Sequence, residues 1–436
     1  MTDKKKILIV SYLFAPQNVI GAIRATKLAK YLSRMGHEVT VVCGEGVTSL
    51  CDPMLERDLA ELTDVHIIRE WNPVRDRKQK AETEVAPSAG NSVAPRPSKA
   101  SLKGRILDQI YLLLRFLADV SFARLGIRGI RQMNREFDVV LTSYGPWSSH
   151  WIGKAVKKQG LASRWIADFR DVVAPPFFRG EGWVRNYLRN VKNNADQITG
   201  VSAGYLDMMG LVSIGTVITN GFDREDLQGM EPAQPIKDAV GEKHSLCFVY
   251  CGQMYGAQRD LRPFFRAVSE LAQEGCLDKA KLLLVHAGHA QDAAIFKAQA
   301  AEFGLGDQVE AKGLLSRDQA IGLQLSADGI LIATWNTPEL LGNLPGKLLE
   351  VLMLGRPVIC CAAGQIPDSE AARVICETRV GCCYEEAAGE ESYQALKSYV
   401  KSLCEAPRGE NPHQADAQAV EQYEYEQVAR RFDNLL

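Results

Sequence analysis

Residues 7–10 read Ile7-Leu8-Ile9-Val10, a continuous apolar run typical of a strand that is buried on both faces of a parallel sheet. A loop with Pro16 and Gly21 follows, and apolar residues at helical spacing predict a helix over residues 22–35. Residues 38–43 then read as a second strand. This order of strand, loop, helix and strand predicts a β-α-β unit, the repeating element of a parallel sheet.

The same order recurs in two series along the chain. Further strands are predicted over residues 138–143, 165–169 and 197–202, and then over residues 247–251, 281–287, 329–333 and 357–361. Helical stretches separate these strands, so the sequence predicts the α/β class with two doubly wound, Rossmann-like domains. The length of 436 residues agrees, because one ordinary core does not accommodate so long a chain.

Composition shifts predict where the parts begin and end. We expect a first domain over residues 1–218, a second over residues 219–415, and a helix over residues 416–436 that crosses to the first domain. Residues 76–104 are rich in Ala, Pro, Ser and charge and hold no aromatic residue, which predicts a mobile linker. Residues 105–135 predict a basic amphipathic helix, which either contacts an anionic membrane surface or packs on its domain with a solvated basic side.

The overall charge and the cysteines exclude several classes of protein. Lys and Arg number 51 against 53 Asp and Glu, so the chain lacks the strong basic excess of a nucleic-acid binder. The eleven cysteines form no Cys-x-x-Cys pair and do not cluster with histidine at zinc spacing, so we expect reduced thiols and no metal. No apolar run reaches the ~18 residues that span a bilayer. We therefore expect a cytoplasmic protein, or one peripheral at the inner face of the membrane.

Residues 342–357 carry the strongest indication of a ligand. Asn343 as a cap and Pro345 at the first helical position predict a short helix, which Gly355 would end. Lys347 and Glu350 share one face of it. The free N–H groups of a helix N-terminus and a lysine suit a phosphate, and the carboxylate suits ribose hydroxyls, so we expect a nucleoside diphosphate. The alternative is an ordinary capped helix with an exposed Lys–Glu pair.

Several segments together resemble bacterial glycosyltransferase family 4, the retaining GT-B enzymes that build surface polysaccharides. The resemblance extends over nearly the whole chain. It rests on the opening strand and loop through Arg24 to Val39, and on the segments Ser143 to His150, Trp165 to Asp171, Thr219 to Asp223, Tyr250 to Gln258 and Leu344 to Pro357. Within them, Asp168-Phe169-Arg170-Asp171 resembles the Asp-Phe-Arg-Asp signature of a subgroup.

The resemblance implies a GT-B fold, in which two Rossmann-like domains face each other across a cleft, and a hexosyltransferase activity. The donor would be a nucleoside-diphosphate sugar, with UDP as the expected nucleotide, and the acceptor a hydroxyl of a glycan or lipid-linked molecule. Lys347 and the N–H groups of Leu344, Gly346 and Lys347 would stabilise the leaving diphosphate, and no metal cofactor would be needed. Glu350 would bind the ribose.

The resemblance also implies further donor-binding and catalytic residues. Besides those in the helix and its opening loop, the expected donor contacts are Gly21, Gly252, Gln253, Gln258, Arg259, His289, Gly313 and Leu314. For Gly21 an ordinary turn is the alternative. Asp168 or Asp171 would orient or deprotonate the acceptor hydroxyl, and Arg170 would restrain a carboxylate or contact phosphate. A structural Asp–Arg pair is the alternative here, and for His150 we expect a core or cap role.

Departures from the family pattern leave other functions open. Many family members carry an acid where this chain has Gly342, and Arg and Lys near the positions of Gln253 and Gln258. These differences allow a catalytically weak sugar-nucleotide-binding subunit of an assembly complex. A sugar-nucleotide epimerase with the same two-domain fold is a second alternative. A dinucleotide oxidoreductase has only Gly44-Glu45-Gly46 in its favour, without the third glycine of the motif.

Overall fold

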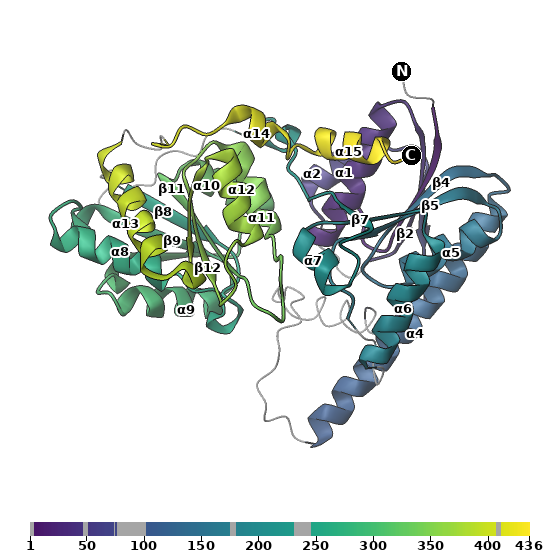
Figure 1. Cartoon of the computed structure of the whole chain (residues 1–436), viewed down its shortest axis with the longest axis horizontal. Helices are drawn as coiled ribbons and strands as arrows, with labels where there is room; N and C mark the ends of the chain where they lie inside the picture. The colour runs from purple at the N-terminus through teal and green to yellow at the C-terminus, as the bar shows by residue number, and fades with distance from the viewer. Residues whose placement is uncertain are drawn as a thin grey trace. The chain divides into compact units, whose positions relative to one another are not determined.

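The computed structural model describes residues 4–46, 51–73, 75, 102–174, 180–230, 246–406 and 411–436. The linker predicted over residues 76–104 lies outside the described residues, apart from its last three, which begin a helix. The chain divides into two compact units (Figure 1). Unit 1 comprises Met1–Asn220 and Tyr425–Leu436, and unit 2 comprises Gly221–Glu424.

Unit 1 is built on a seven-stranded sheet of order β3-β2-β1-β4-β5-β6-β7, in which every neighbouring pair is parallel. Its strands are β1 (Lys6–Ser11), β2 (Glu38–Gly44), β3 (Val65–Ile68), β4 (Phe137–Ser143), β5 (Ala162–Phe169), β6 (Gln197–Gly200) and β7 (Gly215–Val217). Its helices are α1 (Ile20–Arg34), α2 (Pro53–Ala60), α4 (Leu102–Gln132), α5 (Ser148–Lys158), α6 (Glu181–Asn194), α7 (Ala203–Met208) and α15 (Tyr425–Asp433).

Unit 2 repeats the architecture with six parallel strands in the order β10-β9-β8-β11-β12-β13. The strands are β8 (Leu246–Cys251), β9 (Leu282–Ala287), β10 (Val309–Gly313), β11 (Gly329–Trp335), β12 (Val358–Ala363) and β13 (Gly381–Glu385). The helices are α8 (Arg262–Gln273), α9 (Ala290–Ala301), α10 (Arg317–Leu325), α11 (Gly346–Val351), α12 (Glu370–Thr378), α13 (Gly389–Glu405) and α14 (Ala417–Glu421). The two sheets confirm the predicted α/β class with doubly wound domains.

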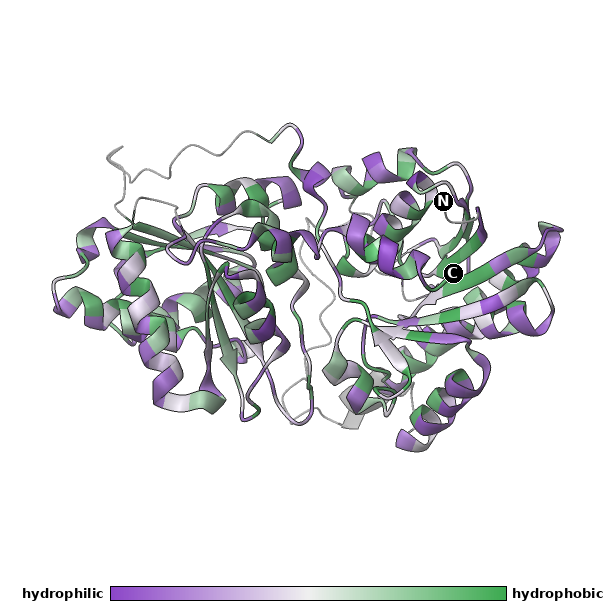
Figure 2. Cartoon of the chain, turned by 45° about the horizontal axis from the view of Figure 1, so that its top comes forward, coloured by the Kyte–Doolittle hydropathy of each residue, from purple (hydrophilic) through white to green (hydrophobic). Residues whose placement is uncertain are grey.

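Both cores form where apolar strands lie between layers of helices, and Figure 2 shows the central strands as predominantly hydrophobic. All four residues of the run Ile7 to Val10 in β1 are completely buried. Full burial of such a side chain stabilises the fold by roughly 1.5–3 kcal/mol, so this single strand anchors the middle of its sheet. Cys360 and Cys361 in β12 are buried in the same way, and all cysteines that the structure describes are free thiols.

Two of the predicted helices differ from the structure. The helix expected after Asn343 begins later, because Pro345 is its N-cap and the Asn343 side chain donates to Thr334 Oγ1 instead of capping. It has only six residues, Gly346–Val351, and continues as a 3-10 turn to Leu354 before Gly355. The single helix predicted over residues 416–436 is also wrong, since α14 and α15 are separate helices there.

Helix α4 corrects the prediction of a basic amphipathic helix over residues 105–135. The helix exists, and it buries Phe122 and Ile130 against its unit. Its exposed side, however, mixes apolar and basic residues. The exposed side chains include Ile110, Tyr111, Leu117 and Leu125 together with Arg115, Arg124, Arg128 and Arg131. Among the residues that the structure describes, no helix is both long enough and apolar enough to cross a membrane.

Candidate functional site

The predicted donor residues of unit 2 gather at the carboxyl edge of its sheet, where β8, β9 and β11 end. The loop after β8 starts at Gly252, whose N–H donates to Ala287 O at the end of β9, 2.8 Å away. Helix α11 follows β11 and brings Lys347 to the same place. The loops at the carboxyl ends of parallel strands are where open α/β sheets bind ligands.

Lys347 lies directly over the end of β8. Its Nζ donates to Cys251 O at 2.8 Å, and a Cβ added to Gly252 would be 2.7 Å from that Nζ. Gly252 also has a φ of 149°, a backbone angle that other residues rarely adopt, so the backbone favours glycine here. Desolvation lowers the pKa of the Lys347 ammonium, and the positive charge of Arg259 lowers it further.

Arg259 is the second cation of this edge. Its guanidinium carbon lies 4.5 Å from the ring centre of Tyr255 and 5.7 Å from that of Trp335, so the cation is in contact with two aromatic rings. Its Nη1 donates to Gln253 O at 3.1 Å. Its Nε is buried without a hydrogen-bond partner.

Neither Lys347 nor Arg259 has a carboxylate partner within ion-pair distance among the described residues. Two cations held this way, near one backbone turn, create a positive potential that an anion would satisfy. The N-terminus of α11 adds less than predicted, because a helix of six residues has a small macrodipole. The positive charge of the site therefore comes chiefly from side chains.

The loop that carries Arg259 has an unusual backbone. Tyr255, Gly256 and Ala257 all have positive φ, at 48°, 63° and 73°. A left-handed conformation costs about 1–2 kcal/mol for each residue that is not glycine, so Tyr255 and Ala257 store strain. The Tyr255 ring repays part of that cost by packing edge-on against Trp335, with the ring centres 5.5 Å apart.

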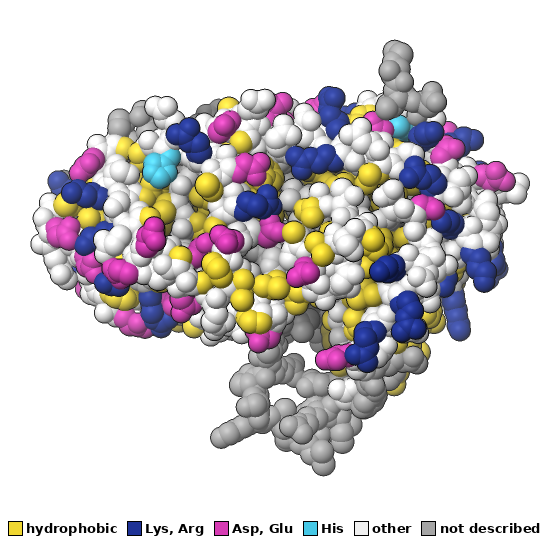
Figure 3. All heavy atoms as spheres, in the orientation of Figure 1, with side chains coloured by type: hydrophobic (Ala, Val, Ile, Leu, Met, Phe, Trp, Pro, Cys, Tyr) yellow, Lys and Arg dark blue, Asp and Glu magenta, His cyan; other side chains and the backbone are white. Residues whose placement is uncertain are grey.

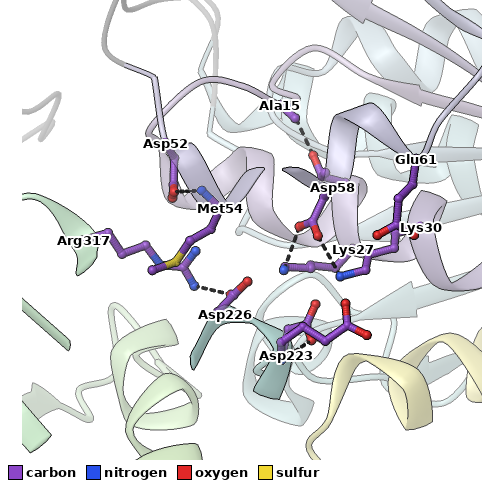
Figure 4. Close-up of polar contacts among 12 residues, drawn as sticks. Ala15, Lys27, Lys30, Asp52, Met54, Asp58, Glu61, Asp223, Asp226 and Arg317 are labelled. Carbon is purple, nitrogen blue, oxygen red and sulfur yellow. Dashed lines mark hydrogen bonds and ion pairs between the residues drawn. The ribbon is translucent and has the colours of Figure 1, made fainter. Parts of the chain in front are cut away.

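Glu350, the predicted ribose ligand, is held by an arginine that the sequence analysis did not single out. Its Oε1 accepts from Arg317 Nε at 2.7 Å, and Arg317 Nη2 donates to Asp226 Oδ2 at 2.8 Å. Figure 4 shows the Arg317 side chain extended toward Asp226. Arg317 thus fixes the position of the Glu350 carboxylate one turn beyond Lys347.

The remaining donor candidates differ in whether they lie at the carboxyl edge of the unit 2 sheet. Gly313, at the end of β10, accepts from Gly288 N at 2.9 Å, so it belongs to the same edge of the sheet. Leu314 beyond it is 55% exposed, and Gln258 is exposed as well. His289 caps α9, while the histidine that contacts the loop is His286, whose Nε2 lies 3.1 Å from Gly252 O. Burial lowers the pKa of His286, which favours its neutral form.

In unit 1 the structure places Asp168 in a buried structural pair, the alternative that the sequence had left open, with Arg24 as its partner. Arg24 donates to both Asp168 oxygens at 2.8 Å, and Thr199 Oγ1 donates to Oδ1 at 2.7 Å. Both side chains are at most 2% exposed. A carboxylate that is paired with a buried arginine and has no exposed surface is poorly placed to receive an acceptor hydroxyl. The sequence carries no signal for this pair, because Arg24 lies in a helix that also contains Lys27 and Lys30 and is 144 residues away from Asp168.

Asp171 and Arg170 behave differently from Asp168. The side chain of Asp171 is 57% exposed, and desolvation by nearby protein atoms raises the pKa of its carboxyl group. Arg170 donates to Tyr144 O at 2.7 Å and to Gly145 O at 3.2 Å. A Cβ added to Gly21 would be 2.1 Å from Arg170 Nη1, so Gly21 makes room for Arg170 in the first turn of α1.

Helix α1 buries two lysines as well as Arg24. Lys27 Nζ and Lys30 Nζ each lie 2.7 Å from an oxygen of Asp58 in α2 (Figure 4). The lysine side chains are at most 1% exposed. Because an unpaired buried charge is costly, these ion pairs lock α2 onto α1.

Comparison with known proteins connects this geometry to a group of enzymes. Residues 245–400, which lie in unit 2, match the family model described as glycosyl transferases group 1. No curated protein matches the chain significantly. The matched segment contains Lys347, Arg259, Arg317 and Glu350.

Solved structures resemble the whole chain. Sucrose-phosphate synthase from Thermosynechococcus elongatus is 14% identical, with a TM-score of 0.58 over 99% of this chain and 98% of that one. OtsA in its apo form is 11% identical, with a TM-score of 0.59 over 98% of each chain. The lipopolysaccharide outer core galactosyltransferase WaaB in its apo form is 12% identical, with a TM-score of 0.53 over 98% of each chain. At these identities the likeness shows the fold alone, and that fold is GT-B, as predicted.

Proposed function

We propose that the protein is a glycosyltransferase that moves a sugar from a nucleoside diphosphate to a hydroxyl acceptor. The single observation that carries the proposal is the pair of cations, Lys347 and Arg259, at the carboxyl edge of the unit 2 sheet, for which the described part of the chain provides no carboxylate within ion-pair distance. The match of the surrounding segment to glycosyl transferases group 1 supports it. The named transferases among the similar structures are consistent with it.

In the proposed reaction the bond between the sugar and the diphosphate breaks, and negative charge grows on the leaving phosphate. Lys347 and Arg259 stabilise that charge, and the N–H groups at the start of α11 add to the effect. These protein groups supply the positive charge that a metal would otherwise provide, so we propose a metal-independent transfer. UDP is the proposed nucleotide, and retention of configuration is part of the proposal by resemblance to family 4.

Glu350 binds the ribose hydroxyls in this proposal. Arg317 holds it in place, and a fixed carboxylate accepts hydrogen bonds from two adjacent hydroxyls. Gly313 at the end of β10 and the exposed Leu314 after it suit a contact with the base.

For the acceptor we propose Asp171 in place of Asp168. Its carboxylate is accessible, and its raised pKa makes it a stronger base than an ordinary aspartate. Arg170 lies beside it, with 3.7 Å between Nη1 and Oδ2, and orients it. The acceptor is a glycan or lipid-linked molecule in surface polysaccharide synthesis.

Helix α4 supports a peripheral contact with an anionic membrane. Figure 3 shows Lys and Arg side chains over the part of unit 1 where Figure 1 draws α5 and α6. The exposed side of α4 combines apolar residues such as Ile110 and Leu117 with Arg124 and Arg128. Apolar insertion and attraction to anionic lipid headgroups reinforce each other in such a helix. We therefore place the protein in the cytoplasm, at the inner face of the membrane.

A screen of nucleotide sugars for slow hydrolysis without acceptor tests the proposal. We expect one donor to be hydrolysed, and Lys347→Ala to lower that rate by about 10²–10³-fold, as for the loss of one oxyanion donor. Lys297→Ala, which removes an exposed lysine of unit 2, is the matched control and should retain the wild-type rate.

Three results would oppose the proposal in different ways. Hydrolysis that Lys347→Ala leaves unchanged would remove the assigned role of the lysine. Tight binding of UDP without turnover of any donor, with or without acceptor extracts, would favour the sugar-nucleotide-binding subunit. Conversion of a sugar nucleotide into its epimer, with the nucleotide still attached, would favour the epimerase.

A further inference from the structure

Unit 1 holds a pocket that the proposed transfer reaction does not use. It lies between α5 and α6, beside β5, and has a volume of about 100 Å³. Its walls include His150 and Trp151 of α5 and Trp183, Asn186, Tyr187 and Asn190 of α6. The four α6 residues are spaced at i, i+3, i+4 and i+7, so they form one continuous face of the helix.

Aromatic rings make the walls rigid. Trp183 stacks on Tyr187 with ring centres 5.1 Å apart, and the His150 ring lies parallel to Tyr187 at 6.3 Å. Trp147 packs edge-on against Trp151 at 4.5 Å, which ties the outer wall to the same cluster. Rings fixed by one another lose little conformational entropy when a ligand binds.

Trp151 is 46% exposed although it belongs to this cluster. An exposed tryptophan forgoes much of the stabilisation that burial of a large aromatic surface gives. Its ring therefore offers apolar surface that a ligand would cover. Phosphate and other small anions gain nothing from such a wall, so the ligand must present an apolar face of its own.

His150 supplies an unsatisfied polar atom in the same pocket. Its Nδ1 is 2.8 Å from Thr142 Oγ1, while its Nε2 is buried and has no hydrogen-bond partner. Burial lowers the pKa of His150 to about 3, so the ring is neutral at physiological pH. A buried polar atom without a partner costs about 1–3 kcal/mol, and a ligand hydroxyl group that reached Nε2 would recover that cost.

The remaining polar groups of the pocket are neutral or already engaged. Asn186 and Asn190 lie four residues apart on exposed positions of α6, and each amide both donates and accepts hydrogen bonds. Lys154, a cation at the pocket, donates to Asn190 Oδ1. The pocket therefore suits a neutral ring with C–H groups on its faces and hydroxyls around its edge. The C–H groups pack on electron-rich aromatic faces while the hydroxyls bind the amides.

We propose that this pocket binds one pyranose ring of a glycan, as a holding site separate from the transfer chemistry. A volume of about 100 Å³ is smaller than the ~150 Å³ cavity that encloses benzene, so the ring enters by one edge and stays partly in solvent. Binding at this site does not depend on turnover of any donor. Its test therefore succeeds or fails separately from the proposed transferase activity.

Fluorine NMR of the full chain labelled with 5-fluorotryptophan tests the proposal directly. The chain has six tryptophans, so the spectrum is small enough to assign with single Trp→Phe variants. The probes are the methyl glycosides of glucose, galactose, mannose and N-acetylglucosamine. We expect at least one of them to shift the Trp151 and Trp183 signals saturably, and to leave the Trp71 signal in place.

Matched variants separate the pocket from general effects. Trp151→Ala should weaken the binding of that glycoside about tenfold, because it removes one stacking wall. Asn186→Ala should weaken it several-fold through lost hydrogen bonds. Trp71 is 53% exposed and does not line the pocket, so Trp71→Ala is the control and should bind like the wild type. Unchanged melting temperatures would show that each variant is folded.

Four outcomes would overturn the proposal. These are no shift with any glycoside, a shift that Trp151→Ala does not weaken, a stronger response to uridine than to the glycosides, and a response only to anionic lipid vesicles. The third would identify a nucleobase site, and the fourth a membrane-contacting surface. None of these four outcomes would bear on the hydrolysis of sugar nucleotides, which tests the proposed transferase activity separately.

Discussion

Charged side chains lie at the carboxyl edges of both sheets, and the two edges differ in whether those charges are neutralised by a partner. In unit 1, Arg24 and Asp168 neutralise each other at 2.8 Å in a fully buried pair. In unit 2, Lys347 and Arg259 point their charge at one backbone turn without a carboxylate partner among the described residues. The first arrangement is complete by itself, whereas the second lacks an anion. This contrast indicates a structural role for the Arg24–Asp168 pair, and it is consistent with the proposed anion-binding role of Lys347 and Arg259.

The same contrast limits what can be inferred about catalysis from a sequence motif. The Asp-Phe-Arg-Asp segment resembled a catalytic signature, yet its first aspartate binds Arg24 and Thr199. Burial and hydrogen bonding, which a sequence does not list, decide whether a carboxylate is available for chemistry.

Removing the buried pair should have the largest effect. Asp168→Asn leaves the Arg24 charge buried without a counter-charge, so we expect the free energy of unfolding to fall by about 3–5 kcal/mol in urea denaturation. Asp207→Asn, at an exposed position of unit 1, is the control and should change it by less than about 0.5 kcal/mol. A fully stable Asp168→Asn protein that has lost turnover would make Asp168 catalytic and break the comparison.

Removing a cation of unit 2 should leave stability intact and lower affinity. For Arg259→Ala we expect UDP to bind about 10–100-fold more weakly in calorimetry, since a hydrogen bond to a charged group is worth about 1.5–3 kcal/mol. Arg259→Lys keeps the charge but loses the guanidinium contact with Tyr255 and Trp335, so its affinity should lie between those of the wild type and Arg259→Ala. Equal affinities for all three proteins would show that no phosphate lies against Arg259.

The carboxylate held by Arg317 sharpens the contrast further. The wild-type protein should bind UDP about tenfold more tightly than 2′,3′-dideoxy-UDP, because the dideoxy compound lacks the two ribose hydroxyls that Glu350 is proposed to bind. Glu350→Gln should reduce that preference to about twofold, with the affinity for the dideoxy compound nearly unchanged. A preference that survives in Glu350→Gln would place the ribose elsewhere.

The smallest expected effect concerns the left-handed loop that carries Arg259. Ala257 has a φ of 73°, so Ala257→Gly should relieve strain and raise the free energy of unfolding by up to about 1 kcal/mol. Ala298→Gly, in the middle of α9, should lower it by about 0.5–1 kcal/mol, which makes a matched pair of opposite sign. A loss of stability in both variants would mean that the loop is not strained.

The sequence by itself determined the elements that depend on neighbouring residues. Apolar runs such as Ile7 to Val10 became buried strands, because a strand covered on both faces needs no polar residue. The α/β class and the place of Lys347 after β11 followed from the same local patterns. Gly355 ends the 3-10 turn that continues α11, and a glycine adopts its φ of 63° without strain.

Only the tertiary structure decided which charged side chains have an oppositely charged partner. Arg24 and Asp168 are separated by 144 residues, and Arg317 reaches Glu350 across 33, so no local pattern announces either pair. The left-handed turn at Tyr255 and Ala257 is equally invisible, because neither residue type favours it. Coulomb energy and desolvation depend on distance and burial in three dimensions, and these quantities exist only once the chain has folded.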